Sequence, residues 1–170
     1  MKALRSSGRR KQILIVVVIG AAVLAGVALA TPFSGLTADT ARGTAGKITL
    51  KEEFANDSSV VLKMRGQMEF VVQRIEAAPG ATFGWHSHPG ENINVIRQGT
   101  LSFYHDEACT TEIEYGPGAV FTSSPDEIHL ARNESSTETV VFYATYFVPK
   151  TTPLQPIRID QPSPGVGCPQ

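Results

Sequence analysis

Two histidines separated by a single residue are the groups in this chain best suited to chemistry. His86 and His88 lie in the segment GWHSHPG. Side chains alternate across a β-strand, so residues two apart lie on the same face. Neutral imidazole is a ligand for iron, manganese, nickel, copper and zinc. The spacing therefore predicts a pair of metal ligands, although two polar residues that bind no metal would show the same spacing.

A longer pattern extends on both sides of the pair. From Gly80 to Gly99 the chain resembles the first motif of the cupin superfamily, G-x5-H-x-H-x3-E-x6-G, at every position except the glutamate, where this chain has Asn92. The overall pattern is similar to the small single-domain cupins of the cupin 2 type, and the resemblance reaches most of residues 66–150.

A second stretch supplies a third histidine. Gly118 precedes His129 by eleven residues and Asn133 follows it by four. This spacing is similar to the second cupin motif, G-x5-P-x-G-x2-H-x3-N. The stretch departs from that motif in two places, because Pro125 is one residue late and Glu127 stands near the position of the second glycine.

The resemblance implies an all-β fold, a jelly-roll barrel whose mouth holds a divalent metal ion. The family ligands that carry over to this chain are His86, His88 and His129. The family's fourth ligand, a glutamate, falls on Asn92, which could bind weakly through its carbonyl oxygen or only line the pocket. The neighbouring Glu91 should face the opposite side of the strand, and it would reach the metal only after a register slip.

Three neutral imidazoles would leave the charge of a divalent ion uncompensated, which favours a small anionic substrate and leaves positions for O2 or water. Some cupins with three-histidine iron centres are dioxygenases, so the resemblance implies an oxidoreductase that uses Fe²⁺, with Mn²⁺, Ni²⁺ and Zn²⁺ as alternatives. A non-catalytic module that binds a metal or a small ligand, and a barrel with no occupied site, stay open. With an ordinary imidazole pKa of about 6.5, metal affinity should fall below about pH 6.

Further residues should support the ligands or line the pocket, since alternation places them on the faces of the motif residues: Asn94, Glu127 and Asn133. A position in the turn after Pro125 is an equally good interpretation of Glu127. His105, near a loop, is predicted to be a surface histidine. Trp85 alternates with His86 and should pack away from the metal, whereas one tyrosine of the segment TVVFYATYFV could reach the pocket.

The elements that must position these residues are short strands. Turn-forming Gly and Pro recur every 8 to 12 residues or so, and no segment has a long amphipathic helical period, which is typical of an antiparallel barrel or sandwich. We predict a barrel over residues 47–150, in which residues 47–65 form either two edge strands or a strand and a loop. Residues 31–46 read as a flexible linker, and residues 151–170 as a Pro-rich tail without regular structure.

The N-terminus predicts a membrane-directed segment. Residues 1–11 contain five basic and no acidic side chains, and residues 13–30 are uncharged and apolar. An 18-residue helix is close to the thickness of a bilayer's hydrocarbon core. Ala28-Leu29-Ala30 fits a signal-peptide cleavage site, so the helix is either removed after Ala30 or kept as a transmembrane anchor. Either outcome places the rest of the chain outside the cytoplasm.

The chain has two cysteines, Cys109 and Cys168. In an oxidising compartment a pair is usually bridged, so we predict a disulfide between them, with two unpaired thiols as the alternative.

Charge excludes one class of partner. Without residues 1–11, ten basic side chains face 16 acidic ones, and nucleic-acid binding needs clustered basic groups. The partners that remain are a small anionic molecule, the membrane through residues 13–30, and a second copy of the chain in a homodimer.

Overall fold

The computed structural model describes residues 32–105, 112–151, 153–165 and 168–169. Across these ranges the chain consists of β-strands joined by turns and loops, which confirms the all-β class. None of the residues described belongs to a helix with the length and hydropathy that a membrane crossing requires. The predicted membrane segment, residues 13–30, lies outside the described ranges.

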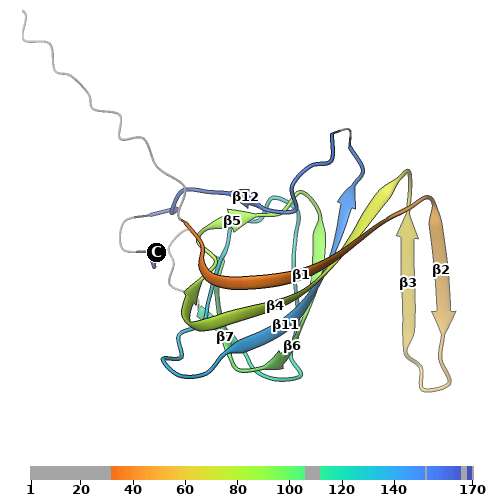
Figure 1. The fold of residues 1–170 in the computed structure, drawn as a ribbon. Helices are drawn as coiled ribbons and strands as arrows, with labels where there is room; N and C mark the ends of the chain where they lie inside the picture. The colour runs from red at the N-terminus through yellow and green to blue at the C-terminus, as the bar shows by residue number, and fades with distance from the viewer. Residues whose placement is uncertain (1–31, 106–111, 152, 166–167, 170) are drawn as a thin grey trace, which may run out of the picture.

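Eight strands form one antiparallel sheet that curls into a jelly-roll barrel (Figure 1). Seven of them follow the order β8-β7-β10-β4-β11-β6-β9, and β1 pairs with β4 beside this path. The strands are β1 (Ser34–Ala45), β4 (Met68–Thr82), β6 (Glu91–Gln98), β7 (Leu101–Tyr104), β8 (Glu112–Tyr115), β9 (Val120–Ser123), β10 (Leu130–Arg132) and β11 (Val140–Pro149).

Two small sheets complete the fold. At one end of the barrel, β5 (His86–Ser87) pairs with β12 (Ile159–Asp160). The hairpin of β2 (Ile48–Glu53) and β3 (Ser59–Met64) projects away from the barrel in Figure 1. Residues 47–65 thus contain two strands, but these form a sheet of their own and are not edge strands of the barrel as predicted.

The alternation of side chains along the strands decides which residues face the interior. In β6, Asn92, Asn94 and Ile96 are buried, whereas Ile93 and Val95 between them are exposed. The pleat of a strand produces this period of two. The same strand therefore contributes one apolar side chain, Ile96, to the core and two amides to the inside of the barrel.

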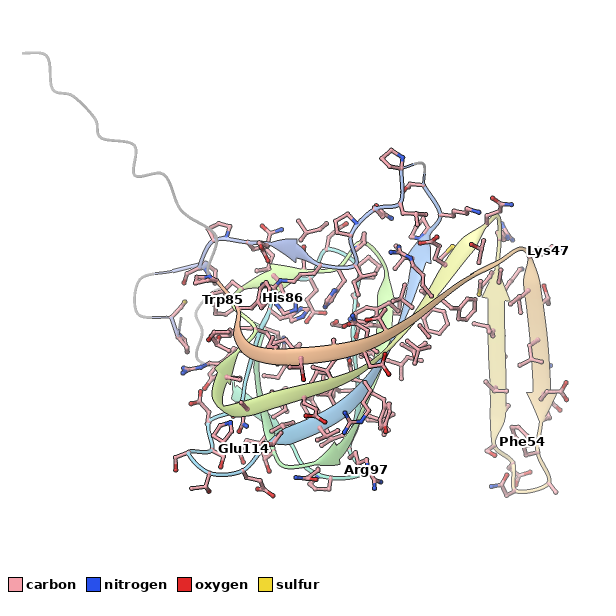
Figure 2. All side chains as sticks on the ribbon, viewed as in Figure 1. Lys47, Phe54, Trp85, His86, Arg97 and Glu114 are labelled. Atoms are coloured by element: carbon pink, nitrogen blue, oxygen red, sulfur yellow. The ribbon has the colours of Figure 1, made fainter. Side chains whose placement is uncertain are left out.

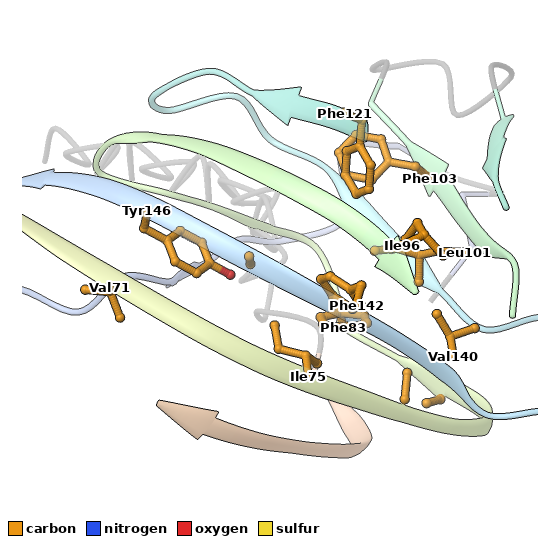
Figure 3. Close-up of a cluster of buried hydrophobic side chains, with 14 of the residues drawn as sticks. Val71, Ile75, Phe83, Ile96, Leu101, Phe103, Phe121, Val140, Phe142 and Tyr146 are labelled. Carbon is orange, nitrogen blue, oxygen red and sulfur yellow. The ribbon is translucent and has the colours of Figure 1, made fainter. Parts of the chain in front are cut away.

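The core fills the barrel with aliphatic and aromatic side chains (Figure 3). Phe83 packs against Phe142, with ring centroids 5.7 Å apart, and Phe103 packs against Phe121 at 5.3 Å. Edge-on and tilted aromatic pairs of this kind are favourable beyond the area they bury. Near one end of this core, the ring of Tyr146 directs its hydroxyl toward the barrel interior (Figure 3).

The predicted linker over residues 31–46 is wrong, because most of it forms β1. Backbone pairing with β4 runs from Ala45 opposite Met68 to Leu36 opposite Ala77. An ion pair between Arg42 and the buried carboxylate of Glu69 adds a side-chain contact. The sequence did not predict this strand because nearly all its side chains are small or polar and exposed, so it has no alternation of apolar residues.

The predicted unstructured tail is also corrected. Within residues 151–170, Ile159 and Asp160 form β12, which pairs with the histidine strand β5. Two more hydrogen bonds fasten the segment to Trp85, since the Gln161 backbone N–H donates to the Trp85 carbonyl and the indole Nε1 donates to the carbonyl of Pro169. The C-terminal segment is therefore part of the barrel end that carries the histidines.

Candidate metal centre

Three histidines converge at one end of the barrel, near the position of His86 in Figure 2. One ring nitrogen from each of His86, His88 and His129 lies within 4.8 Å of the others. The ring centroids are 4.3 Å apart for His86 and His129, 4.9 Å for His86 and His88, and 5.1 Å for His88 and His129. All three side chains are buried. The structure thus brings together the three residues that the sequence predicted.

The backbone fixes the distance between the two motifs. His86 and His129 lie opposite each other and exchange both backbone hydrogen bonds, each with an N···O distance of 2.9 Å. His88 follows two residues later, just past the end of β5, and its ring centroid lies 4.9 Å from that of His86. Its carbonyl accepts a hydrogen bond from the backbone N–H of Asp126, which ties the turn before His129 to the first motif.

The departures from the second motif have a simple local explanation. The motif's second glycine lies three residues before the histidine, which in this chain is Asp126. Asp126 has a φ of 61°, in the left-handed region that favours glycine. Aspartate tolerates this conformation better than most residues do. The turn is therefore kept without the glycine.

Each histidine is oriented through its Nδ1 atom by a backbone carbonyl. The acceptors are Gly84 for His86 at 2.8 Å, Ile157 for His88 at 2.6 Å and Glu127 for His129 at 3.1 Å. A carbonyl can only accept, so each Nδ1 carries the proton and each Nε2 keeps its lone pair. This is the usual arrangement of metal-binding histidines in proteins.

The electrostatic environment keeps these imidazoles neutral. Burial lowers the pKa of His88 to about 4 and that of His129 to about 3. Burial also lowers the pKa of His86 well below its ordinary value, and the proximity of His129 lowers it further. Metal binding requires the unprotonated ring, so the donor set fits a divalent ion at neutral pH.

Asn92 occupies the place of the family's glutamate and supplies no carboxylate. Its side chain is buried beside the three histidines in the wall of a small inner cavity. Its Nδ2 donates to Ser123 Oγ at 2.6 Å, and its Oδ1 accepts from Asn94 Nδ2 at 2.6 Å. Among the described residues, the metal-ligand group contains the three histidines and no acid.

Glu91 faces away from the histidines, as the alternation of β6 predicted. It lies on the outer side of the barrel, where it lines a groove with Met68, Ile93 and Phe147. No register slip brings it to the metal site. Gly90, just before it, lies where a Cβ would come within 2.1 Å of the Phe147 carbonyl oxygen, so only glycine fits at this crossing.

Two residues predicted to support the ligands play other roles. The Glu127 carboxylate accepts a hydrogen bond from the Ser124 backbone N–H at 2.9 Å, so it closes its own turn, while its backbone carbonyl orients His129. Asn133 is fully buried and its Nδ2 donates to the carbonyls of Ala77, Ala78 and Glu138. Asn133 therefore ties its own loop to β4 and does not line either cavity at the histidines.

Asn94 lies in the wall of the inner cavity, and His105 lies at the surface. His105 has an exposed side chain 3.9 Å from the Glu127 carboxylate. Trp85 is fully buried and packs with Tyr104, Leu130 and Cys168. The described part of the chain has no free cysteine, but Cys109 lies outside it, so the Cys109–Cys168 disulfide stays a prediction.

Two cavities meet at the histidines. The inner one, of about 30 Å³, lies inside the barrel and has the polar group of Asn92, Asn94 and Ser123 in its wall. The outer one, of about 290 Å³, is bounded mainly by apolar side chains. His86, His88, Phe83 and Tyr146 line both cavities. Tyr146 is thus the tyrosine that reaches the pocket, and burial raises the pKa of its hydroxyl.

Sequence reasoning missed the contribution of the two flanking segments. Phe33 and Leu36, beside and in β1, and Ile157 and Arg158, before β12, line the outer cavity. One signal could have revealed the second of these segments. The stretch PIRID alternates apolar and charged residues, which is typical of a short strand.

Comparison with known families agrees with the motifs. Residues 73–146 match the Cupin_2 family model, described as a cupin domain. This range includes all three histidines and most of the barrel. The match and the motifs together support a small cupin domain of the cupin 2 type over these residues. A search of curated proteins found no match.

Solved structures also match part of the chain. A protein with a double-stranded β-helix domain from Klebsiella pneumoniae is 20% identical, with a TM-score of 0.41, over 61% of this chain and 77% of that one. The Cupin_2 domain of an XRE family transcriptional regulator from Enterobacter cloacae is 26% identical, with a TM-score of 0.40, over 47% of this chain and 82% of that one.

A polyketide cyclase from Streptomyces resistomycificus is 20% identical, with a TM-score of 0.41, over 46% of this chain and 54% of the cyclase. The chain thus spans about half the length of that enzyme. At this level of similarity, the activities in these names remain those of the other proteins.

Proposed function

We propose that this protein is a metal-dependent oxidoreductase of the dioxygenase type that acts on a small anionic molecule. The observation that carries the proposal is the donor set. Three buried, neutral imidazoles converge, and the described residues add no carboxylate to the group. A divalent ion held there keeps its full charge, which attracts an anion and leaves coordination positions for it.

The residues of the chain have distinct tasks in this proposal. His86, His88 and His129 would hold the ion through Nε2, because Nδ1 of each is occupied by a carbonyl. An iron(II) ion bound there would supply the redox chemistry. The apolar wall of the outer cavity excludes water from the reacting region, and the Asn92, Asn94 and Ser123 group presents a polar surface on the inner side.

A non-catalytic binding module is the second candidate function. The small inner cavity, of about 30 Å³, favours it, because little room remains on that side for a co-reactant. In this alternative the three histidines hold a metal that only binds a ligand, or they hold the metal as cargo. Both functions need the same ligands and differ in whether a bound molecule is converted.

Metal analysis of protein purified through its own export route separates the two. Iron at about one per chain, together with O2 uptake when small carboxylates are added, supports the oxidoreductase. Zinc at the same stoichiometry and no O2 uptake supports the binding module. Protein that neither contains nor takes up a divalent metal contradicts both.

We also propose that the barrel lies outside the cytoplasm, directed there by residues 13–30 and either anchored to the membrane or released after Ala30. The basic residues 1–11 and the apolar run after them support this proposal. A reporter that is active only in the cytoplasm, fused after Lys150, should give no signal. A bright cytoplasmic signal would contradict export.

A further inference from the structure

The outer cavity at the histidines contains an unusual combination of side chains. Its wall is largely apolar and includes Phe33, Leu36, Ile75 and Phe83. Among the described residues that line it, Arg158 is the only one with a formal charge at neutral pH. A charge in an apolar wall is costly unless a partner compensates it. Asp160 forms an ion pair with the Nε end of Arg158, so the other end of the guanidinium is the part that calls for an explanation.

The contacts of Arg158 leave part of its guanidinium without a partner. Nε donates to Asp160 Oδ1 at 2.6 Å, and the guanidinium carbon lies 5.3 Å from the ring centroid of Phe33. Nη2 is buried and makes no hydrogen bond to any of the residues that the structure describes. Buried donors in native proteins nearly always have an acceptor, so the missing acceptor points to a ligand.

Arg158 also lies close to the metal ligands. The carbonyl of Ile157, the preceding residue, orients His88. Arg158 lines the outer cavity together with His86 and His88. A divalent ion held by the histidines would be repelled by the positive charge of Arg158. An anion between the guanidinium and the ion would remove this repulsion.

We propose that Arg158 binds the carboxylate of a small substrate whose apolar body fills the outer cavity. The proposal rests on the proposed function, since it names the substrate class of the same site. The flat guanidinium matches the geometry of a carboxylate. A phosphate, with more oxygens and up to two charges, would need more donors than this apolar wall provides. The remaining walls of the cavity suit an aliphatic or aromatic body.

The residues that would select this substrate lie outside the family domain. Arg158 and Ile157 follow residues 73–146, whereas Phe33 and Leu36 precede them. The cupin barrel thus supplies the histidines, and the two flanking segments supply the anion site and much of the apolar wall. This division makes Arg158 a specificity-determining residue of this chain.

A pair of probes tests the proposal without any reaction. Hexanoate and hexanamide have nearly the same size and shape, but only hexanoate is charged. Calorimetric titration of the full chain, metal-free and zinc-loaded, should show hexanoate binding at least about tenfold more tightly than hexanamide in both forms. Arg158→Gln should abolish most of this preference in the metal-free form. Arg158→Met, which keeps the apolar stem, should do the same if the glutamine variant folds poorly.

Arg97→Gln is the matched control, because Arg97 is exposed at the end of the barrel opposite His86 (Figure 2). This variant should keep the preference for hexanoate. The proposal is overturned if hexanoate shows no preference over hexanamide in the wild type, or if both Arg158 variants keep it. Zinc content measured on the same samples tests the metal site separately. A chain that loses the preference in the Arg158 variants but binds no metal would support the carboxylate site and contradict the proposed function.

Discussion

The backbone carbonyl of Ile157 lies 2.6 Å from Nδ1 of His88. The two residues are 69 positions apart in the chain, and the contact joins the C-terminal segment to a ligand in the first cupin motif. It fixes which nitrogen of His88 faces the other two histidines. The metal site is therefore built by the family domain together with the segment that follows it.

Removal of this carbonyl should weaken metal binding. A chain that ends after Lys150 loses Ile157 and β12, and we expect its metal affinity to fall about tenfold to a hundredfold, as for other groups that orient a ligand. A chain that ends after Gln161 is the control, because it keeps Ile157 and β12 but lacks Cys168 just as the shorter chain does. Competition with a chelator measures both affinities, and circular dichroism checks that the barrel remains. Equal affinities in the two truncations would contradict a role for Ile157.

Asn92→Glu should make protein stability depend on the metal. Without metal, the new carboxylate is buried beside Asn94 with no cation, which should destabilise the fold by about 2 kcal/mol or more. With metal, the carboxylate supplies the family's fourth ligand and halves the net charge, so stability should recover, metal affinity should rise and anion affinity should fall. Asn92→Gln is the control, because glutamine has the same size as glutamate but no charge. If metal raised the melting temperature of the glutamine variant as much as that of the glutamate variant, ligation by the carboxylate would be ruled out.

Asn133→Ala should destabilise the protein without loss of metal. The variant removes the donor from the carbonyls of Ala77, Ala78 and Glu138, the first of which is buried, so we expect a loss of about 1–3 kcal/mol in the free energy of unfolding. Urea denaturation measures this loss, and metal content should equal that of the wild type. Asn56→Ala, in the exposed turn of the β2–β3 hairpin, should cost at most about 1 kcal/mol. If the Asn133 variant lost its metal, Asn133 would have to be counted among the residues that support the metal site.

The stability of the metal-free protein should fall as the pH drops below about 6.5. In the unfolded chain the three histidines take up protons near pH 6.5, whereas in the folded chain the pKa is about 4 for His88 and about 3 for His129. The unfolded state then binds more protons, and each such histidine costs about 1.4 kcal/mol per pH unit until its folded-state pKa is reached.

A variant with glutamine at all three positions isolates this effect, because its other titrating groups are unchanged. Urea denaturation between pH 7 and pH 4 should give a steeper fall for the wild type than for this variant, and parallel profiles would contradict the lowered pKa values. The same burial corrects the expectation that metal affinity falls below about pH 6. Protons compete with the metal only near the folded-state pKa, so affinity should stay nearly constant down to about pH 5.

The sequence predicted the barrel and the three ligands because local patterns encode them. The two-residue spacing predicted that His86 and His88 lie together, and the spacing from Gly118 to His129 predicted the third histidine. The structure brings all three together. Long-range pairing explains what the sequence did not reveal. Strand β1 is held by hydrogen bonds to β4 and carries no apolar pattern of its own. Arg158 reaches the site only because β12 pairs with β5, a contact between segments about 70 residues apart that no local signal specifies.

The replacement of each histidine by alanine tests the metal centre most directly. Four variants, at His86, His88, His105 and His129, are loaded with iron(II) without oxygen, desalted and analysed for bound iron. We expect about one iron per chain in the wild type and in His105→Ala, since that side chain is exposed and outside the cluster. The other three should retain only a small fraction, because two imidazoles hold a divalent ion far less tightly than three. If His105→Ala loses iron and His129→Ala keeps it, the three-histidine site is wrong.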